Sequence, residues 1–130
     1  MNNQGLGFNV TFSAATADAN ETNVTITVVD NDGNTLAEPW ILDVWLSDAS
    51  TGVGLTGTTA SGAVEAETNG GTVLVAMTAK KALRVQTLAT GKFVLTITDT
   101  AKTGFFVCAT VPGSGRTAVS DQLVTADYGS

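Results

Sequence analysis

The sequence predicts an all-β fold, an antiparallel sandwich or barrel made of short strands. Apolar and polar residues alternate with a period of two along most of the chain, and turns rich in Gly, Asn and Asp separate the alternating segments. Nowhere do apolar residues recur with helical spacing over ten residues. Threonine supplies 22 of the 130 residues, and this β-branched side chain favours pleated sheets over helices.

The alternation gives about eight strands in order along the chain. Residues 6–12 and 23–29 alternate most clearly and are predicted to be half-buried strands. Further strands are predicted at residues 39–48, 73–78, 82–88, 92–98, 104–111 and 117–124. The length fits one domain, in which residues 1–21 form an N-terminal strand or arm and residues 22–130 form the sandwich.

Residues 51–71 interrupt this pattern with about twenty residues rich in Gly, Thr and Ser. A short edge strand is predicted near residues 63–66. A stretch of this length inside a compact domain is typically functional or mobile. Two interpretations stay open: a flexible crossover between two sheets, or an arm that becomes ordered only against a neighbouring molecule.

The strand at residues 39–48 carries the candidate interface. Ile41, Asp43 and Trp45 share one face, opposite an apolar face of Trp40, Leu42, Val44 and Leu46. One interpretation is an exposed apolar pair that contacts a partner. The other is that a second sheet covers Trp45, because the inward face of a central strand is easily misassigned. With residues from the following segment, the candidate interface consists of Ile41, Asp43, Trp45, Leu55 and Val64.

The net charge of −6 argues against nucleic acid as a partner, because phosphate binding requires clustered Lys and Arg. All six basic residues lie after residue 79, whereas nine of the twelve acidic residues lie before it. Either strands from the two halves interleave and the charges mix in space, or the surface is two-signed and suits packing against copies or a partner.

Catalytic groups are scarce, and no enzymatic activity, cofactor or metal is predicted. The chain has no histidine, which removes the common general base and typical zinc ligands. Cys108 lies in an apolar run and is predicted to be a small buried hydrophobe. The pair Glu65 and Glu67 lacks the aromatic platforms of a sugar-cleaving site. No signal peptide is predicted, and no apolar run reaches the roughly 18 residues of a membrane span.

The stretch Asp30-Asn31-Asp32-Gly33-Asn34 has the composition of a calcium loop. An EF-hand loop requires glycine at position 6 and a bidentate glutamate at position 12. With Asp30 at position 1 these places hold Thr35 and Ile41, and with Gly33 at position 6 the last place holds Pro39. A hairpin turn between two strands fits better. A shallow calcium site at Asp30 and Asp32 that a partner completes stays open.

Two long runs resemble known Ig-like modules. The runs "VTITVVDNDGNTLAEPWILDVWLSD" and "GKFVLTITDTAKTGFFVCATV" resemble the bacterial immunoglobulin-like sandwich of invasin-type repeats. With "LSDASTG", "TAKKALRVQTLATGKFVLTITDT" and the end "VTADYGS", most of residues 22–130 is more similar to the small Ig-like virion structural proteins of tailed bacteriophages. The resemblance implies an Ig-like antiparallel β-sandwich of about seven to nine short strands.

The resemblance also implies a role. It points to a non-enzymatic virion structural protein, with a capsid decoration or cement protein on the outer surface of the phage head as the leading role. The expected partners are the major capsid protein or other virion proteins, in a homo-oligomeric or multi-copy assembly without nucleic acid or membrane. The expected location is the virion, assembled in the host cytoplasm. Two alternatives stay open: a tail, neck or fibre component, and a cell-surface adhesin-type binding module.

Overall fold

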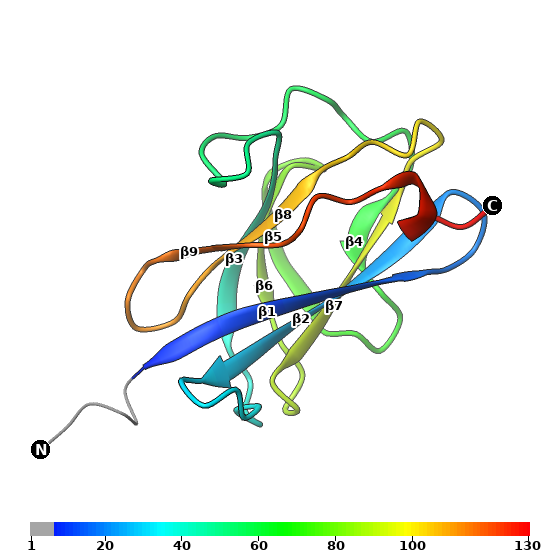
Figure 1. Ribbon diagram of the computed structural model, residues 1–130. Coiled ribbons are helices and arrows are strands. Elements are labelled where there is room, and N and C mark those ends of the chain that lie inside the picture. Colours follow the sequence, from blue (N-terminus) through cyan, green and yellow to red (C-terminus); the bar gives the residue numbers. More distant parts are fainter. Residues whose placement is uncertain (1–6) are drawn as a thin grey trace, which may run out of the picture.

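The computed structural model describes residues 7–130, which form nine strands and one 3₁₀ turn at Thr125–Asp127 (Figure 1). Residue 6, the first of the predicted N-terminal strand, lies outside the described residues. The strands are β1 (Phe8–Thr16), β2 (Glu21–Asp30), β3 (Ile41–Ser47), β4 (Val64–Ala66), β5 (Thr72–Thr78), β6 (Ala82–Gln86), β7 (Lys92–Thr98), β8 (Phe106–Thr110) and β9 (Thr117–Val119). No helix in this part of the chain is long and apolar enough to cross a membrane.

The strands form two antiparallel sheets that pack face to face, so the predicted all-β sandwich is confirmed. The first sheet has four strands in the order β1-β2-β7-β4, and the second has five in the order β5-β6-β3-β8-β9. The whole of β1 pairs with β2, from Phe8 opposite Asp30 to Thr16 opposite Thr22. Residues 8–16 of the predicted N-terminal segment are therefore a strand of the sandwich.

The strand order corresponds to a variable-type immunoglobulin sandwich. The order β1-β2-β7-β4 takes the place of strands A-B-E-D, and β3, β8 and β9 take the places of C, F and G. The strands β5 and β6 extend the second sheet beyond β3. The chain departs from the immunoglobulin order in two respects: β4 comes before these two additional strands in the sequence, and the edge strand β5 comes before β6, which pairs with β3.

The alternation of the strands places the core between the sheets. In β2 every second residue from Thr22 to Val28 is buried, and the intervening residues are half-buried on the other face. The second sheet contributes the inward faces of β3, β6 and β8. The largest fully buried side chains are Phe93, Phe105, Ile26, Leu42, Leu46, Leu95 and Ile97. Apolar area buried in this way supplies most of the driving force for folding.

The predicted hairpin turn at residues 30–34 is confirmed, but the predicted pairing of β2 with the strand that follows, β3, is wrong. Gly33 has φ +86°, and the backbone pairs briefly at Val29 and Thr35. Beyond this bridge the chain leaves the first sheet, and β3 pairs with β6 and β8 in the second. The turn therefore starts a crossover between sheets, because β2 already has β1 and β7 as neighbours and leaves no edge for β3.

Residues 51–71 cross from the five-stranded sheet to the four-stranded sheet and back, so the predicted crossover between two sheets is confirmed. The predicted edge strand is confirmed as β4, which pairs with β7. Backbone hydrogen bonds also hold the flanks of β4, from Gly62 to Thr98 and from Glu67 to Val94. In contrast, the strand predicted at residues 117–124 is mostly wrong, because only Thr117–Val119 belongs to the sheet.

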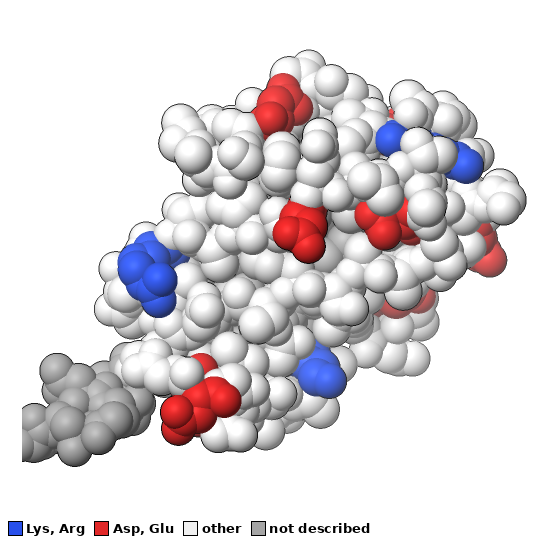
Figure 2. Space-filling model, in the orientation of Figure 1, with Lys and Arg blue, Asp and Glu red and all other residues white. Residues whose placement is uncertain are grey.

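The charges of the two halves of the chain mix in space. The strand β7, from the basic half, lies between β2 and β4 from the acidic half, and β6 lies between β5 and β3. Figure 2 shows the resulting face, on which acidic and basic side chains are scattered and do not gather into areas of one sign. Interleaving of the strands is therefore the correct interpretation of the uneven charge.

Candidate functional site: the outer face of the five-stranded sheet

The strand β3 presents two faces, and the outer one is open to solvent along part of its length. Leu42, Val44 and Leu46 point into the core and are each 1% exposed. Ile41, which lies on the outer face, is 61% exposed. The first sheet does not cover the outer face, so Ile41 and Trp45 both lie outward, and the interpretation in which a second sheet covers Trp45 does not hold.

A loop of residues 48–57 folds back over one end of this outer face. The indole Nε1 of Trp45 donates a hydrogen bond to the carbonyl oxygen of Gly52 at 2.9 Å. The Ser47 hydroxyl donates to the carbonyl oxygen of Val53 at 3.2 Å, and the backbone N–H of Thr56 donates to the carbonyl oxygen of Leu46 at 2.8 Å. These bonds cover Trp45 from one side and leave it half-buried.

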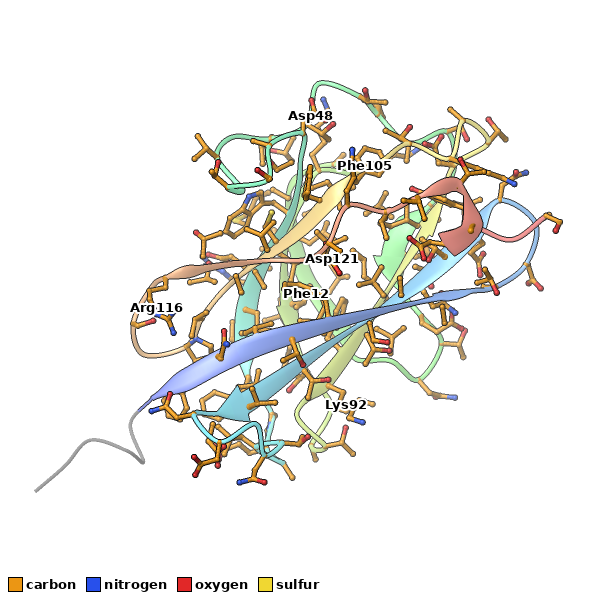
Figure 3. All side chains as sticks on the ribbon, viewed as in Figure 1. Phe12, Asp48, Lys92, Phe105, Arg116 and Asp121 are labelled. Carbon is orange, nitrogen blue, oxygen red and sulfur yellow. The ribbon has the colours of Figure 1, made fainter. Side chains whose placement is uncertain are left out.

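Asp48 closes this loop at its base, where Figure 3 labels it. Its carboxylate accepts hydrogen bonds from the backbone N–H of Gly57 at 3.0 Å and from the hydroxyl of Thr56. The bond from Gly57, followed by the bond from Thr56, lowers the pKa of Asp48 below its usual value. The closed loop holds Val53 and Leu55 toward solvent, with 76% and 45% exposed.

Gly52 lets the loop lie directly on the sheet. Its φ is +78°, and a β-carbon at this position would lie 3.2 Å from the Sγ of Cys108 and 2.9 Å from a methyl group of Val119. Cys108 is fully buried beneath the loop, as predicted, and burial raises the pKa of its thiol to about 11. A thiol that stays protonated at neutral pH is a poor nucleophile.

Between the loop and β5 lies a shallow apolar hollow of about 310 Å³, which we call the β3 groove. A second hollow of about 380 Å³ continues from it past Ile41 toward the turn at residues 112–115. The β3 groove is lined by Asp43, Trp45, Gly52, Gly54, Leu55, Met77, Ala82 and Thr110. Three of the predicted interface residues, Asp43, Trp45 and Leu55, therefore line one hollow.

An ion pair lies where the two hollows meet, because Asp43 lines both of them and Arg84 lines the second. Arg84 Nε lies 2.8 Å from Asp43 Oδ1, and Arg84 Nη2 lies 3.3 Å from Asp43 Oδ2. The hydrogen bonds to Asp43, followed by its charge, raise the pKa of Arg84. Both side chains are partly exposed, so the pair stabilises the fold only modestly. It neutralises the only charged lining residue of the β3 groove.

Val64 does not belong to this surface. It lies on β4 in the other sheet, opposite the buried Ile97 of β7, and its half-buried side chain packs against the core. The sequence pattern missed the exposed apolar residues Leu74, Val75 and Met77 of β5. The signal for them was the continuous apolar run at residues 73–77, which leaves no polar face on this strand.

Asp30, considered as a calcium ligand, and Glu67, considered as a catalytic carboxylate, both have structural roles. Asp30 Oδ1 accepts hydrogen bonds from the backbone N–H groups of Asp32 and Asn34, both at 2.9 Å, and the bond from Asn34 lowers the pKa of Asp30. Glu67 accepts a hydrogen bond from the Thr96 hydroxyl at 2.8 Å. Across residues 7–130, no three acidic or cysteine side chains gather in a way that would hold a metal ion.

The fold and this surface define a class: an Ig-like β-sandwich with an apolar groove on the outer face of its larger sheet. Comparisons with protein-family models, with curated proteins and with solved structures find no match for this chain.

Proposed function

We propose that this chain is a non-enzymatic structural protein of a virion, a decoration protein that binds the outer surface of a phage head. One structural observation supports the proposal most directly, namely the β3 groove. Its apolar lining carries no unpaired charge, and large exposed apolar surface is typical of protein-binding sites. The resemblance of residues 22–130 to phage Ig-like virion proteins indicates that the partner is the major capsid protein or another virion protein.

The shape of the groove indicates what the partner presents. The loop at residues 48–57 and the turn at residues 112–115 flank the outer face, so the surface is hollow between them. An apolar loop tip of a capsid protein fits such a hollow better than a flat surface does. Many copies on one head would then add stability through avidity, even where each single contact is weak.

The first experiment measures the protein in purified particles of the phage that encodes it. We expect a copy number that matches the capsid lattice, measured by quantitative mass spectrometry of intact virions. A few copies per particle would instead identify a tail, neck or fibre component. Absence from the particles, with the protein found on cell surfaces, would contradict a virion role and favour an adhesin.

The second experiment tests the groove itself. Leu55→Asp places a charge at the rim of the β3 groove, and Val124→Asp is the matched control at an exposed apolar residue elsewhere. We expect the Leu55 variant to bind heads that lack the protein at least about 30-fold more weakly, as expected for a central interface residue. The control should bind normally. Equal binding by both variants would exclude the groove as the contact.

A further inference from the structure

Three polar side chains meet on the outer face of the four-stranded sheet, around Thr96 of β7. The hydroxyl oxygen of Thr96 lies 2.7 Å from Asn23 Oδ1 and 2.8 Å from Glu67 Oε2. Asn23 belongs to β2 and lies directly opposite Thr96, whereas Glu67 follows β4 on the other side of β7. Thr96 therefore lies within hydrogen-bond distance of a carboxamide on one side and of a carboxylate on the other.

The position of the Thr96 proton makes its oxygen a nucleophile. A hydroxyl has one proton, so it can donate to only one of the two neighbouring oxygens. Donation to the carboxylate of Glu67 is favoured, because a hydrogen bond to a charged group is about twice as strong as one between neutral groups. The lone pairs of the Thr96 oxygen then remain free on the side of Asn23. A hydroxyl paired with a base in this way is an activated nucleophile.

The carbon atom that such a nucleophile would attack is close. A C=O bond measures about 1.2 Å, so an oxygen 2.7 Å from Oδ1 lies at most about 3.9 Å from Cγ of Asn23. Reacting atoms in productive arrangements lie about 3–3.5 Å apart, so little movement of Asn23 is needed. Exchange of the oxygen and nitrogen of the carboxamide leaves Cγ in place, and the approach is therefore the same in both orientations.

The fold holds these groups in position and limits the access of water. Thr96 is 5% exposed, and Asn23 and Glu67 are half-buried. The backbone of Glu67 is fixed on both sides, since its N–H donates to the carbonyl oxygen of Val94 at 2.9 Å and its carbonyl oxygen accepts from Gly70 N–H at 2.8 Å. The carboxylate is thus in place before any reaction, and the exclusion of water favours attack by Thr96 over hydrolysis.

We propose that Thr96 and Asn23 form an intramolecular ester bond that joins β2 covalently to β7. Glu67 takes the hydroxyl proton as the Thr96 oxygen attacks Cγ of Asn23, and it gives this proton to the departing nitrogen. The C–N bond of the carboxamide breaks, the new C–O bond remains, and one ammonia molecule leaves. Glu67 then has a chemical role in addition to its structural hydrogen bond. The reaction occurs once per chain, so it is a maturation step and not enzymatic turnover.

The ester would strengthen the sandwich at its first sheet. β2 and β7 are the two central strands of that sheet, and the two linked residues are 73 positions apart in the chain. A covalent link restricts the unfolded chain, and the restriction is greater for a long loop than for a short one. With Cys108 as its one cysteine, the chain has no internal disulfide to supply such a link. The inference does not depend on the virion role.

The test is the intact mass of the full chain, measured by mass spectrometry after complete unfolding. We expect the wild type to be lighter than its sequence by the mass of one ammonia molecule. Thr96→Val, which keeps the shape of the side chain, should have the full mass of its sequence, and Glu67→Gln should form the bond at least about 100-fold more slowly. A wild type with the full mass of its sequence would overturn the proposal and leave three hydrogen-bonded side chains.

Thr98→Ala is the matched control. Thr98 lies on the same face of β7, and its hydroxyl donates to the carboxylate of Glu21 at 3.3 Å and not to a carboxamide. We expect this variant to lose ammonia as the wild type does. Circular dichroism checks that each variant is folded. If folded Thr96→Val is lighter by the same mass as the wild type, Thr96 is not the nucleophile and the proposal is wrong.

Tryptic digestion then locates the bond. Residues 1–79 contain no Lys or Arg, so trypsin leaves residues 1–80 in one piece, and cleavage after Lys92 and Lys102 releases residues 93–102. We expect residues 93–102 to stay attached to residues 1–80 and to be released by hydroxylamine, which cleaves esters. Loss of ammonia at another site, such as Asn69 before Gly70, would leave residues 93–102 free from the start and would overturn the proposal.

Discussion

Asp99 and Tyr128 tie the turn after β7 to the C-terminal segment. Asp99 is 2% exposed, and its carboxylate accepts hydrogen bonds from the backbone N–H groups of Thr103 at 3.0 Å and Ser61 at 3.2 Å. The hydroxyl of Tyr128 donates to the carbonyl oxygen of Thr103 at 2.7 Å. Thr103 is thus held from both sides. Burial of both side chains without loss of hydrogen bonds is what makes this polar cluster stable inside the fold.

This arrangement predicts a pH dependence at Asp99. Burial raises the pKa of Asp99, but the hydrogen bonds from Thr103, Ser61 and Ala101 outweigh it and hold the pKa below its usual value. A carboxyl whose pKa falls on folding stabilises the protein above its unfolded pKa of about 4, and the contribution is lost as the pH falls through the lower folded pKa. We expect Asp99→Asn to lower the free energy of unfolding at pH 7 by about 1–3 kcal/mol.

Urea unfolding at several pH values checks this expectation. Between pH 7 and about pH 3 the stability of the variant should fall less than that of the wild type, because the variant has no Asp99 to protonate. Asp30 and Asp48 also have lowered pKa values, so some acid sensitivity should stay. A variant with the same slope as the wild type would show that Asp99 does not carry the effect.

Among the elements, the loop at residues 48–57 determines whether the β3 groove exists before a partner binds. The bonds of Asp48 to Thr56 and Gly57 close the loop from within, and the bond from Trp45 anchors it to the sheet. A loop held in this way forms one wall of a preformed groove, which reduces the entropy that binding must overcome.

Limited proteolysis tests whether the loop is held in place before a partner binds. Thermolysin cleaves beside large apolar residues, and Val53 and Leu55 are its exposed targets in the loop. We expect the wild type to resist cleavage there, and Asp48→Ala to be cut much faster while most of the fold persists. Asp43→Ala, which breaks only an exposed ion pair, is the control. Rapid cleavage of the wild type in this loop would contradict a preformed groove.

The same elements show what sequence patterns reveal. Alternation predicts the strands and the outward face of Ile41, Asp43 and Trp45, because a period of two fixes which side chains share a face. It does not reveal which sheet a strand joins, as the crossover after β2 shows. Alternation also does not predict the loop at residues 48–57. Hydrogen bonds from the side chains of Ser47 and Asp48 to the backbone hold this loop, in place of the backbone hydrogen bonds between paired strands.

Two other errors have local causes. Val64 is apolar and precedes a glutamate in a Gly-rich segment, but it faces inward because the short strand β4 pairs with β7. After Val119 the regular ladder ends although the chain stays beside β8: Ser120 N–H still donates to the Val107 carbonyl, but the Ser120 hydroxyl accepts the hydrogen bond from Val107 N–H. A side chain that takes the place of a backbone hydrogen-bond partner in this way leaves no periodic pattern in the sequence.

At the scale of the whole molecule, the β3 groove draws its lining from four neighbouring strands of one sheet. Asp43 and Trp45 come from β3, and Met77, Ala82 and Thr110 come from β5, β6 and β8. The loop at residues 48–57 adds the remaining wall. The four-stranded sheet supports this surface from behind, so the integrity of the sandwich determines the groove.

The role of β1 gives the last prediction, because this strand completes the four-stranded sheet. Val10 is 4% exposed, and Phe8 and Phe12 pack against the core. Burial of three such side chains contributes on the order of 5 kcal/mol, comparable to the whole stability of a small domain. We expect a chain that begins at residue 17 to lose cooperative thermal unfolding, measured by circular dichroism beside the full chain. A truncated chain that unfolds cooperatively at an unchanged midpoint would show that β1 is a dispensable arm.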